Sequence, residues 1–370
     1  MIDSIDFEAL RGIGLSQALV ARLFSLSASE PGDRLMRITE VQRDRVTLHD
    51  GHTALPAQTW PTLRLALQMQ ADTLVVGDWV LARETQPGEW WAAARVPPET
   101  RLLRRDSRGE RQPLVSNVDT ALLVMGMGHD FNLRRLDRYL ALVRLAGVRP
   151  VVVLSKADLH AEPAARVLAV RRHLGLEQGG RLHGEVDVLA LDGRAETARA
   201  ALAPWLGVGQ TLVLMGSSGA GKSTLTNTLA QADGGSLGSL QSTGPVRQGD
   251  DRGRHTTTAR SLHRCPAGAC IIDTPGLRGL QLDADEAQLD AAFDDVASLA
   301  PHCRFRDCEH HDEPGCAVRP AIAPERLLSY QKLMREARRH EMTVFDRQQQ
   351  MAVWKARGRA AKAVSRSKRG

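Results

Sequence analysis

Residues 211–224 read Thr-Leu-Val-Leu-Met-Gly-Ser-Ser-Gly-Ala-Gly-Lys-Ser-Thr. An apolar run is followed by a glycine, four further residues and Gly221-Lys222-Ser223, and a helical pattern begins at Thr224. A buried strand, a glycine-rich loop and a helix in this order form an anion cradle, because backbone N–H groups and the positive end of the helix dipole point at bound phosphate. The stretch therefore predicts a nucleotide-phosphate site in an α/β fold. The alternative, an accidental Gly/Ser-rich turn, leaves the flanking strand and helix unexplained.

Within this phosphate loop, two side chains have specific expected roles. We expect Lys222 to reach the outer phosphates and act in catalysis, and the Ser223 hydroxyl to bind Mg²⁺. The residues expected to contact the nucleotide are Gly216, Ser217, Ser218, Gly219, Ala220, Gly221, Lys222, Ser223 and Thr224.

A second motif, Cys270-Ile-Ile-Asp273-Thr-Pro-Gly276, lies downstream of the loop. It places the Asp273 carboxylate at the end of a buried strand, where it can hold Mg²⁺ through water. Gly276 then offers its backbone N–H to the terminal phosphate. Asp-Thr-Pro-Gly in this setting resembles the second switch of translation-type GTPases, whereas the motif alone would be compatible with an ordinary turn.

Between these motifs lies Gly253-Arg-His255-Thr256-Thr257-Thr258. A GTPase needs a threonine here that closes over Mg²⁺ and the terminal phosphate. We expect Thr257 to fill this role, with Thr256 as the second choice. The flanking polar residues suit a segment that orders and releases with the nucleotide state.

The base-reading motif stands upstream of the phosphate loop, as Ser155-Lys156-Ala157-Asp158 at the end of the strand Val151–Leu154. Asp158 would accept hydrogen bonds from the guanine N1 and N2 groups, and the Lys156 stem would pack over the ring. Adenine lacks those donors, so it would leave a buried Asp158 unpaired. Ser155 replaces the usual asparagine and has a shorter reach. Lys-x-Asp alone also occurs in surface turns, but its place at a strand end favours base recognition.

A further loop, Ala190-Leu-Asp-Gly193, follows the strand Val186–Leu189 and is a candidate for a backbone contact with guanine O6. The motifs therefore run base loop, second base loop, phosphate loop, switch one, switch two. This order is a circular permutation of the usual GTPase order.

In residues 113–283, apolar runs alternate with helical patterns, which predicts a parallel sheet covered by helices on both faces. Apolar runs begin at Thr120, Val151, Val186, Thr211 and Cys270, and helical patterns cover 133–145 and 164–174.

The N-terminal third has a different pattern. Residues 7–27 predict one or two short helices, and the stretch from Leu35 to about Arg105 shows short β-like runs separated by turn signals. Several short strands of this kind predict a small barrel. The runs begin at Leu35, Arg45, Thr73, Trp79 and Trp90. We expect Trp79 in the core, whereas Trp60, Trp90 and Trp91 either pack or stack on nucleic-acid bases.

Near the C-terminus, Cys303, Cys308, His310 and Cys316 form Cys-x4-Cys-x-His-x5-Cys. Three thiolates and one imidazole make a closed tetrahedral set, which is typical of one structural Zn²⁺. The alternative is a group of buried free thiols. Cys265 and Cys270 fall outside the set and are expected to be ordinary structural residues.

The sequence resembles a bacterial family of circularly permuted, zinc-containing GTPases that depend on the small ribosomal subunit and act in its biogenesis. The resemblance covers nearly the whole chain. Besides the motifs above, it is carried by Gly77-Asp-Trp-Val, Asn117-Val-Asp119, His129-Asp-Phe-Asn and Arg138-Tyr-Leu.

This resemblance implies an N-terminal OB-fold, a central GTPase and a C-terminal zinc domain in which His310 binds the metal, rather than His302 or His311. It also implies that His255 is catalytic, together with Lys222 and Thr257. A role of His255 in packing or RNA contact stays open. Leu277 follows Gly276 and cannot orient water, so slow intrinsic turnover stimulated by a large partner is expected.

Composition and charge limit the classes of partner and the cell compartment that we expect for the chain. The net charge is +6, and residues 335–370 carry eleven Lys and Arg against three acids, which suggests a polyanionic partner such as nucleic acid. A solubilising tail is the alternative. We expect no secretory signal, no membrane span and no disulfide framework from five cysteines, and therefore a cytoplasmic protein. We also expect a monomer.

The motifs predict a GTPase that binds GTP or GDP with Mg²⁺. The resemblance implies that it contacts the small ribosomal subunit and its ribosomal RNA and acts late in subunit maturation. The alternatives are an RNA-binding scaffold with incidental turnover and a phosphate-loop ATPase or kinase. The predicted domains are a helical extension (1–34), an OB-fold RNA-binding domain (35–112), the permuted GTPase domain (113–283), a helical zinc-binding domain (284–346) and a basic tail (347–370).

Overall fold

The structure is a computed structural model that describes residues 5–26, 30–42, 45–106, 109–176, 186–230, 260–274 and 281–341. Within these residues, no helix is both long enough and apolar enough to cross a lipid bilayer.

Two short helices open the chain, as predicted: α1 (Phe7–Arg11) and α2 (Gln17–Phe24). Each begins after a capping side chain. Asp6 accepts a hydrogen bond from the Ala9 N–H at 3.0 Å, and Ser16 accepts one from the Leu19 N–H at 3.1 Å. Such caps satisfy N–H groups that the first helical turn leaves free.

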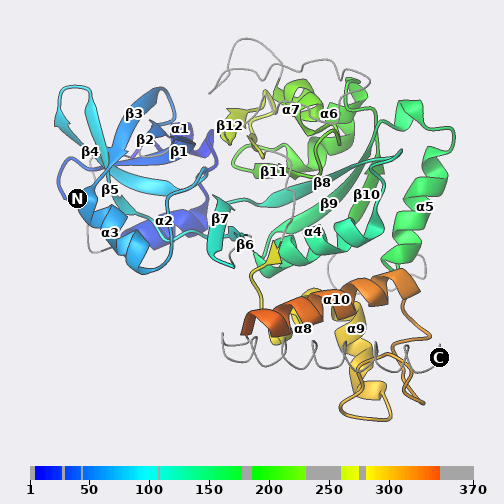
Figure 1. Cartoon of the computed structure of the whole chain (residues 1–370). Helices are drawn as coiled ribbons and strands as arrows, with labels where there is room; N and C mark the ends of the chain where they lie inside the picture. Colours follow the sequence, from blue (N-terminus) through cyan, green and yellow to red (C-terminus); the bar gives the residue numbers. More distant parts are fainter. Residues whose placement is uncertain are drawn as a thin grey trace, which may run out of the picture.

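Five strands then form a closed barrel (Figure 1). They are β1 (Arg34–Gln42), β2 (Arg45–His49), β3 (Ala54–Thr59), β4 (Trp79–Gln86) and β5 (Glu89–Arg95). Their order is β1-β2-β3-β5-β4, and β4 pairs back with β1. β3 and β5 are parallel, and helix α3 (Pro61–Met69) lies between β3 and β4 in the chain. This closed topology confirms the predicted OB-fold.

The barrel departs from the predicted strands at two points: β3 (Ala54–Thr59) lies outside the predicted runs, and one predicted run forms no strand. The run Thr73–Val76 forms no strand; it is a connection before β4 in which Leu74, Val75 and Val76 are buried. The Val75 N–H donates to the Asp78 carboxylate at 2.9 Å instead of to a neighbouring strand. Burial of an irregular connection therefore accounts for the apolar pattern that predicts a strand at this position.

The tryptophans of the barrel have two kinds of environment. Trp79 is fully buried, as predicted, and Trp90 is buried as well. Trp60 and Trp91 are half-buried and pack edge to face with ring centroids 5.6 Å apart. Packing therefore accounts for Trp79 and Trp90.

The second body is a six-stranded sheet in the order β10-β9-β8-β11-β13-β12. All neighbours are parallel except β12 and β13, which are antiparallel. β12 also pairs with β1 of the barrel at Ser261 and Glu40, so one continuous sheet joins the two bodies. The strands are β8 (Thr120–Gly126), β9 (Arg149–Ser155), β10 (Asp187–Ala190), β11 (Thr211–Met215), β12 (Ser261–Arg264) and β13 (Cys270–Asp273).

Helices cover both faces of this sheet, as predicted. On β8, Leu123 belongs to the core cluster that includes α4 and α5, whereas Leu122 belongs to the cluster that includes α6 and α7. In Figure 1, α6 and α7 lie above the sheet and α4 lies below it. The bounds are α4 (Leu133–Leu145), 3-10 helix η1 (Ala157–Leu159), α5 (Pro163–His173), α6 (Thr197–Leu202), 3-10 helix η2 (Ala203–Trp205) and α7 (Lys222–Ala230).

A small three-stranded sheet lies between the barrel, the six-stranded sheet and the C-terminal helices in the chain. It consists of β6 (Arg101–Arg105), β7 (Arg111–Ser116) and β14 (Gln281–Leu282), in the order β14-β6-β7. β6 and β7 link the barrel to the six-stranded sheet, and β14 precedes the C-terminal helices.

The C-terminal part is helical and packs beneath α4 (Figure 1). It contains α8 (Glu286–Ala292), α9 (Asp294–Leu299), 3-10 helix η3 (Ala300–His302) and α10 (Pro324–Glu341). Arg138 of α4 makes two hydrogen bonds of 2.7 Å to the Glu336 carboxylate of α10. Such bidentate pairs fix orientation as well as distance.

Candidate functional site

The phosphate loop lies between β11 and α7, as the sequence predicted. At Gly216 it passes so close to β8 that an added Cβ would lie 2.2 Å from the carbonyl oxygen of Val124. Only glycine permits this approach. The buried Lys222 donates from Nζ to the carbonyl oxygens of Gly216 and Ser217, at 3.1 and 2.8 Å. Burial lowers the pKa of Lys222, while the nearby Asp273 and Asp130 carboxylates act in the opposite direction.

Asp273 ends β13, which is parallel to β11, so the carboxylate lies beside the phosphate loop. The Ser223 hydroxyl donates to Asp273 Oδ2 at 3.2 Å. The next residue, Thr274, fixes the chain by donating from Oγ1 to the carbonyl oxygen of Leu214 at 2.6 Å. The fold thus brings together two oxygen side chains of the kind that Mg²⁺ prefers.

The base loop follows β9 and contacts the phosphate loop directly. The buried Ser155 hydroxyl donates to the carbonyl oxygen of Ala220 at 2.6 Å. Lys156 has a left-handed backbone with a φ of 60°, and its Nζ donates to the carbonyl oxygen of Gly219 at 2.8 Å. The structure therefore brings the two predicted motifs together, although about 65 residues separate them.

The second base loop also lies against the first. The N–H of Ala157 donates to the carbonyl oxygen of Leu191 at 3.3 Å. Asp158 is exposed, and the burial of its carboxylate against a bound base stays a prediction.

Predicted site residues from both switches lie outside the described residues, including Thr256, the second choice for the switch-one threonine. The other site residues are His255 and Thr257 of switch one and Gly276 of switch two.

One contact joins the phosphate loop to His129-Asp-Phe-Asn, a motif for which the sequence indicates no specific role. Ser217 donates from its hydroxyl to Asp130, which lies in the loop between β8 and α4. These two residues are 87 positions apart. No local spacing indicates the contact, because it depends on β8 and β11 being neighbours in the sheet.

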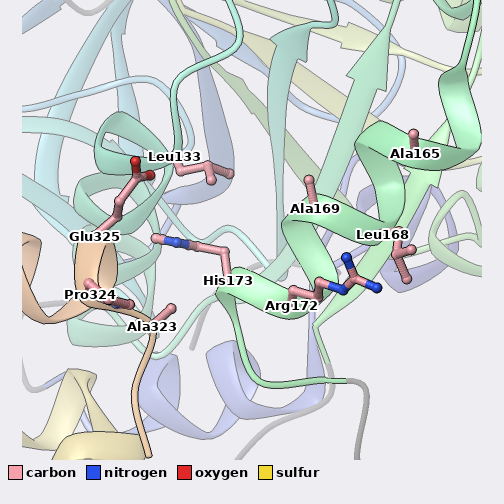
Figure 2. Close-up of a pocket in the computed structure, with 9 residues that line it drawn as sticks. All are labelled: Leu133, Ala165, Leu168, Ala169, Arg172, His173, Ala323, Pro324 and Glu325. Carbon is pink, nitrogen blue, oxygen red and sulfur yellow. The ribbon is translucent and has the colours of Figure 1, made fainter. Parts of the chain in front are cut away.

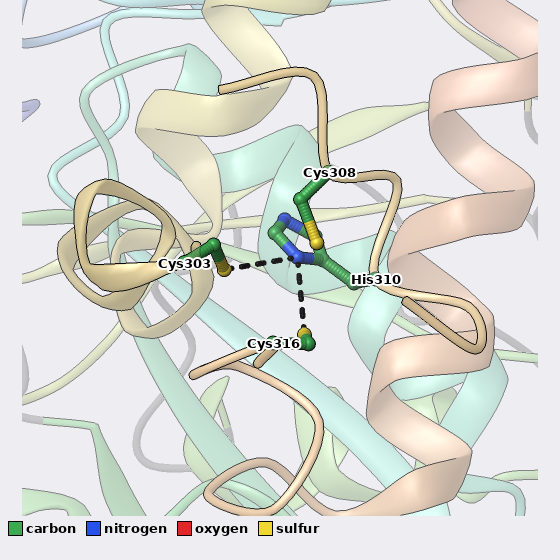
Figure 3. A group of neighbouring side chains, drawn as sticks. All are labelled: Cys303, Cys308, His310 and Cys316. Atoms are coloured by element: carbon green, nitrogen blue, oxygen red, sulfur yellow. Dashed lines mark hydrogen bonds between the residues drawn. The ribbon is translucent and has the colours of Figure 1, made fainter. Parts of the chain in front are cut away.

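The four predicted metal ligands converge between η3 and α10 (Figure 3). One ligand atom from each of Cys303, Cys308, His310 and Cys316 lies within 4.8 Å of all the others. His310 Nδ1 is 3.7 Å from Cys303 Sγ and 3.6 Å from Cys316 Sγ. A tetrahedral site with ordinary Zn–S and Zn–N bond lengths has an S···N edge of about 3.6 Å. The donor set and its size therefore fit a metal ion.

Backbone groups around the cluster support it further. The Ala317 N–H points at Cys303 Sγ and the Arg319 N–H at Cys316 Sγ, each at 3.4 Å. At Cys303, burial acts to raise the pKa, but the backbone donors outweigh it and the pKa is lowered, which favours the thiolate form that binds metal. By contrast, burial raises the pKa of Cys265 to about 12, in keeping with an ordinary core residue.

A cavity of about 400 Å³ lies where α4, α5 and the start of α10 meet (Figure 2). Most of its lining is apolar or small, with Arg172, His173 and Glu325 as the polar exceptions. None of its lining residues belongs to the phosphate loop, the base loops or the metal cluster, so we assign no part of the site to it.

Comparison with known proteins gives a consistent result. A model of the RsgA GTPase family matches residues 96–283. A relative from Mesorhizobium japonicum, named small ribosomal subunit biogenesis GTPase RsgA, is 43% identical over 317 residues, which cover 84% of this chain and 86% of the relative. A relative of the same name from Xanthomonas axonopodis pv. citri is 40% identical over 346 residues, or 90% of both chains.

Two solved structures share the fold. YjeQ from Thermotoga maritima aligns with a TM-score of 0.60 at 23% identity, over 82% of this chain and 98% of that chain. YloQ, described as a circularly permuted GTPase, aligns with a TM-score of 0.57 at 21% identity, over 86% of this chain and 100% of that chain.

Proposed function

The chain belongs to the RsgA GTPase family, and we propose that it hydrolyses GTP in the course of small ribosomal subunit assembly. The family and the fold establish a circularly permuted GTPase. The role in subunit biogenesis follows the printed name of its relatives, which match over most of their length.

One observation carries the nucleotide part of the proposal: the base loop holds the phosphate loop through Ser155 and Lys156. The two loops follow parallel strands, β9 and β11, and leave the same edge of the sheet. A guanine at Asp158 and a polyphosphate at the phosphate loop would therefore belong to one molecule. Nucleotides bind at this edge in open α/β sheets.

Each group of the site has a proposed role. Asp158 accepts from guanine N1 and N2, Lys156 and Ala157 frame the base, and Lys222 faces the outer phosphates with the amides of the loop. Ser223, Asp273 and Thr257 would hold Mg²⁺, which neutralises charge on the phosphates. Gly276 would donate its N–H to the terminal phosphate, and His255 would position the attacking water. Catalysis of this kind is mainly positioning and charge stabilisation.

The metal cluster is proposed to hold one structural Zn²⁺. Three thiolates and an imidazole close the coordination sphere, so no position is left for a substrate. Binding of zinc would stabilise the C-terminal part, which positions α10 against α4.

The partners are proposed from charge and fold. The OB-fold barrel and the basic residues 347–370 would contact ribosomal RNA, since OB-folds bind nucleic acid and basic segments bind its phosphates. We further propose that the protein acts as a monomer in the cytoplasm, where subunits mature. For its domains we propose the bounds predicted from the sequence.

The test is the rate of GTP hydrolysis by the purified protein with and without small ribosomal subunits, beside an ATP control. Stimulation confined to GTP is the expected result, and His255→Ala should then abolish it. If subunits change nothing, the ribosomal part of the proposal is wrong. If ATP is hydrolysed equally well, the base assignment is wrong.

A substitution at Asp158 tests base recognition separately. In Asp158→Asn the amide can donate a hydrogen bond, which matches the O2 atom of xanthine and not the N2 amine of guanine. We expect this variant to prefer XTP over GTP. Asp192→Asn in the second base loop is the matched control and should keep the preference for GTP.

A further inference from the structure

Asp130 lies beside the phosphate loop because of how the sheet is ordered. β8 and β11 are parallel neighbours, with Leu123 opposite Met215. The loops that follow these two strands therefore leave the sheet side by side. One loop begins at Gly216 and carries Ser217, and the other carries Asp130 before α4 begins.

The Asp130 carboxylate is held by three groups. It accepts one hydrogen bond from the Ser217 hydroxyl and another from the Gly126 N–H at 3.0 Å. It also forms an ion pair with Arg135. Arg135 also donates to the backbone carbonyl of Asp130. The side chain of Asp130 is 20% exposed, so most of it is shielded from solvent. Gly126 and Arg135 therefore fix this carboxylate relative to β8 independently of its contact with the phosphate loop.

Ser217 connects Asp130 to the lysine of the loop. Its hydroxyl donates to Asp130, and its carbonyl oxygen accepts from Lys222 Nζ at 2.8 Å. The position of Ser217 thus affects both the path of the loop backbone and the direction of the Lys222 ammonium.

We propose that Asp130 is a positioning residue for the polyphosphate of the nucleotide: it anchors Ser217, and thereby orients the loop amides and Lys222. The proposal rests on the nucleotide site described above. A carboxylate near a polyphosphate is repulsive unless its charge is compensated. Arg135 supplies this compensation, so Asp130 can hold the loop without opposing the ligand.

A purely structural role is the competing explanation, in which Asp130 only stabilises the start of α4. That start already has a cap, because Asn132 accepts from the Arg135 N–H at 2.9 Å. The contact of Asp130 with Ser217 adds nothing to the helix. The two explanations differ in whether removal of the Ser217 hydroxyl alone impairs nucleotide binding.

The experiment uses the full chain and four variants: Ser217→Ala, Ser217→Thr, Asp130→Ala and the double variant with both alanines. His129→Ala, an exposed neighbour, is the control. We measure the Kd for GDP and GTP, KM and kcat for GTP, and the thermal unfolding midpoint without nucleotide.

Ser217→Ala should weaken GDP and GTP binding about ten-fold, or about 1.4 kcal/mol, because one charge-assisted hydrogen bond is lost. KM should rise accordingly while kcat changes less, and the unfolding midpoint should match that of the control. Ser217→Thr keeps the hydroxyl and should restore binding. The double variant should be no weaker than Asp130→Ala, since both changes remove one interaction.

Three results would overturn the inference. They are wild-type affinity in Ser217→Ala, effects of the two alanine changes that add fully, and losses of affinity that only follow a lowered unfolding midpoint. Failure of the wild-type protein to bind GTP would instead overturn the proposed function.

Discussion

The Ser155 hydroxyl lies 2.6 Å from the carbonyl oxygen of Ala220 and donates a hydrogen bond to it. Both residues are buried, so the bond is shielded from competing water. It spans 65 positions of sequence and ties the base loop to the phosphate loop. Ser155 stands where GTPases usually carry asparagine, and this bond shows that a serine can join the two loops.

Ser155→Ala should therefore weaken guanine-nucleotide binding. The change leaves the buried Ala220 carbonyl without its hydroxyl donor, at a cost of about 1–3 kcal/mol shared between folding and binding. We expect the affinity for GDP to fall about five-fold to ten-fold, measured by titration calorimetry. Ser155→Asn should bind at least as tightly as the wild type, because its longer amide offers donors to both loops. Unchanged affinity in Ser155→Ala would show that Lys156 alone suffices to join them.

Removal of the metal should unfold the C-terminal part before the rest. Ligand binding in small zinc domains supplies much of the folding free energy. Mass spectrometry under native conditions should find one zinc per chain, and Cys308→Ser should lose it. This variant should also show an early unfolding transition in hydrogen exchange, confined to residues 286–341. Cys265→Ala, a core cysteine outside the cluster, should keep its zinc. Retention of one zinc by Cys308→Ser would exclude the four-ligand site.

Those parts of the fold that depend on local pattern were predictable. The helix 133–145 matches α4, and every apolar run of the six-stranded sheet forms a strand. The metal cluster was predictable for the same reason, because its four ligands lie within 14 residues. Short-range spacing constrains such features before any tertiary contact forms.

Features that depend on distant partners were not predictable. β12 reads Ser-Leu-His-Arg, and it is a strand because β13 and β1 lie on either side of it. The arginine-rich β6 resembles a polar connection, yet Arg105 pairs with Asp283 and Arg104 with Gln112. The contact between Asp130 and Ser217 belongs to the same class. In each case, tertiary structure supplies the partner.

A buried ion cluster should contribute strongly to stability. Arg326 of α10 pairs with Asp137 of α4 and Asp295 of α9, and His173 of α5 contacts Asp137 at 2.9 Å. Arg326→Met would leave two buried carboxylates without their cation, at a cost of about 3–5 kcal/mol. Arg335→Met, at an exposed position of the same helix, should cost much less. Chemical denaturation of both variants gives the comparison. Equal free energies of unfolding in the two variants would mean that solvent compensates the charges of the two carboxylates.

Asp283 offers a test of how switch two is connected to the barrel. Residues 275–280 separate Thr274 from β14, and Asp283 directly follows β14. Its buried carboxylate binds Arg105 of β6 and Arg111 of β7, the hairpin that leads from the barrel to the six-stranded sheet. A displacement of switch two would therefore act on this hairpin through the pairing of β14 with β6 and through the Asp283 carboxylate.

Asp283→Asn removes the charge that holds both arginines and should weaken the coupling of switch two to the hairpin, leaving the pairing of β14 with β6. We expect basal GTP hydrolysis within about two-fold of the wild type, since no nucleotide contact changes. Stimulation by small ribosomal subunits should fall several-fold, because a contact at the barrel acts less strongly on the switch. Arg111→Met, which removes the more exposed arginine, should give a smaller effect in the same direction. Asp187→Asn, from an exposed ion pair with Arg149, is the control and should leave stimulation intact. Full stimulation of Asp283→Asn would mean that the signal reaches the switch by another route.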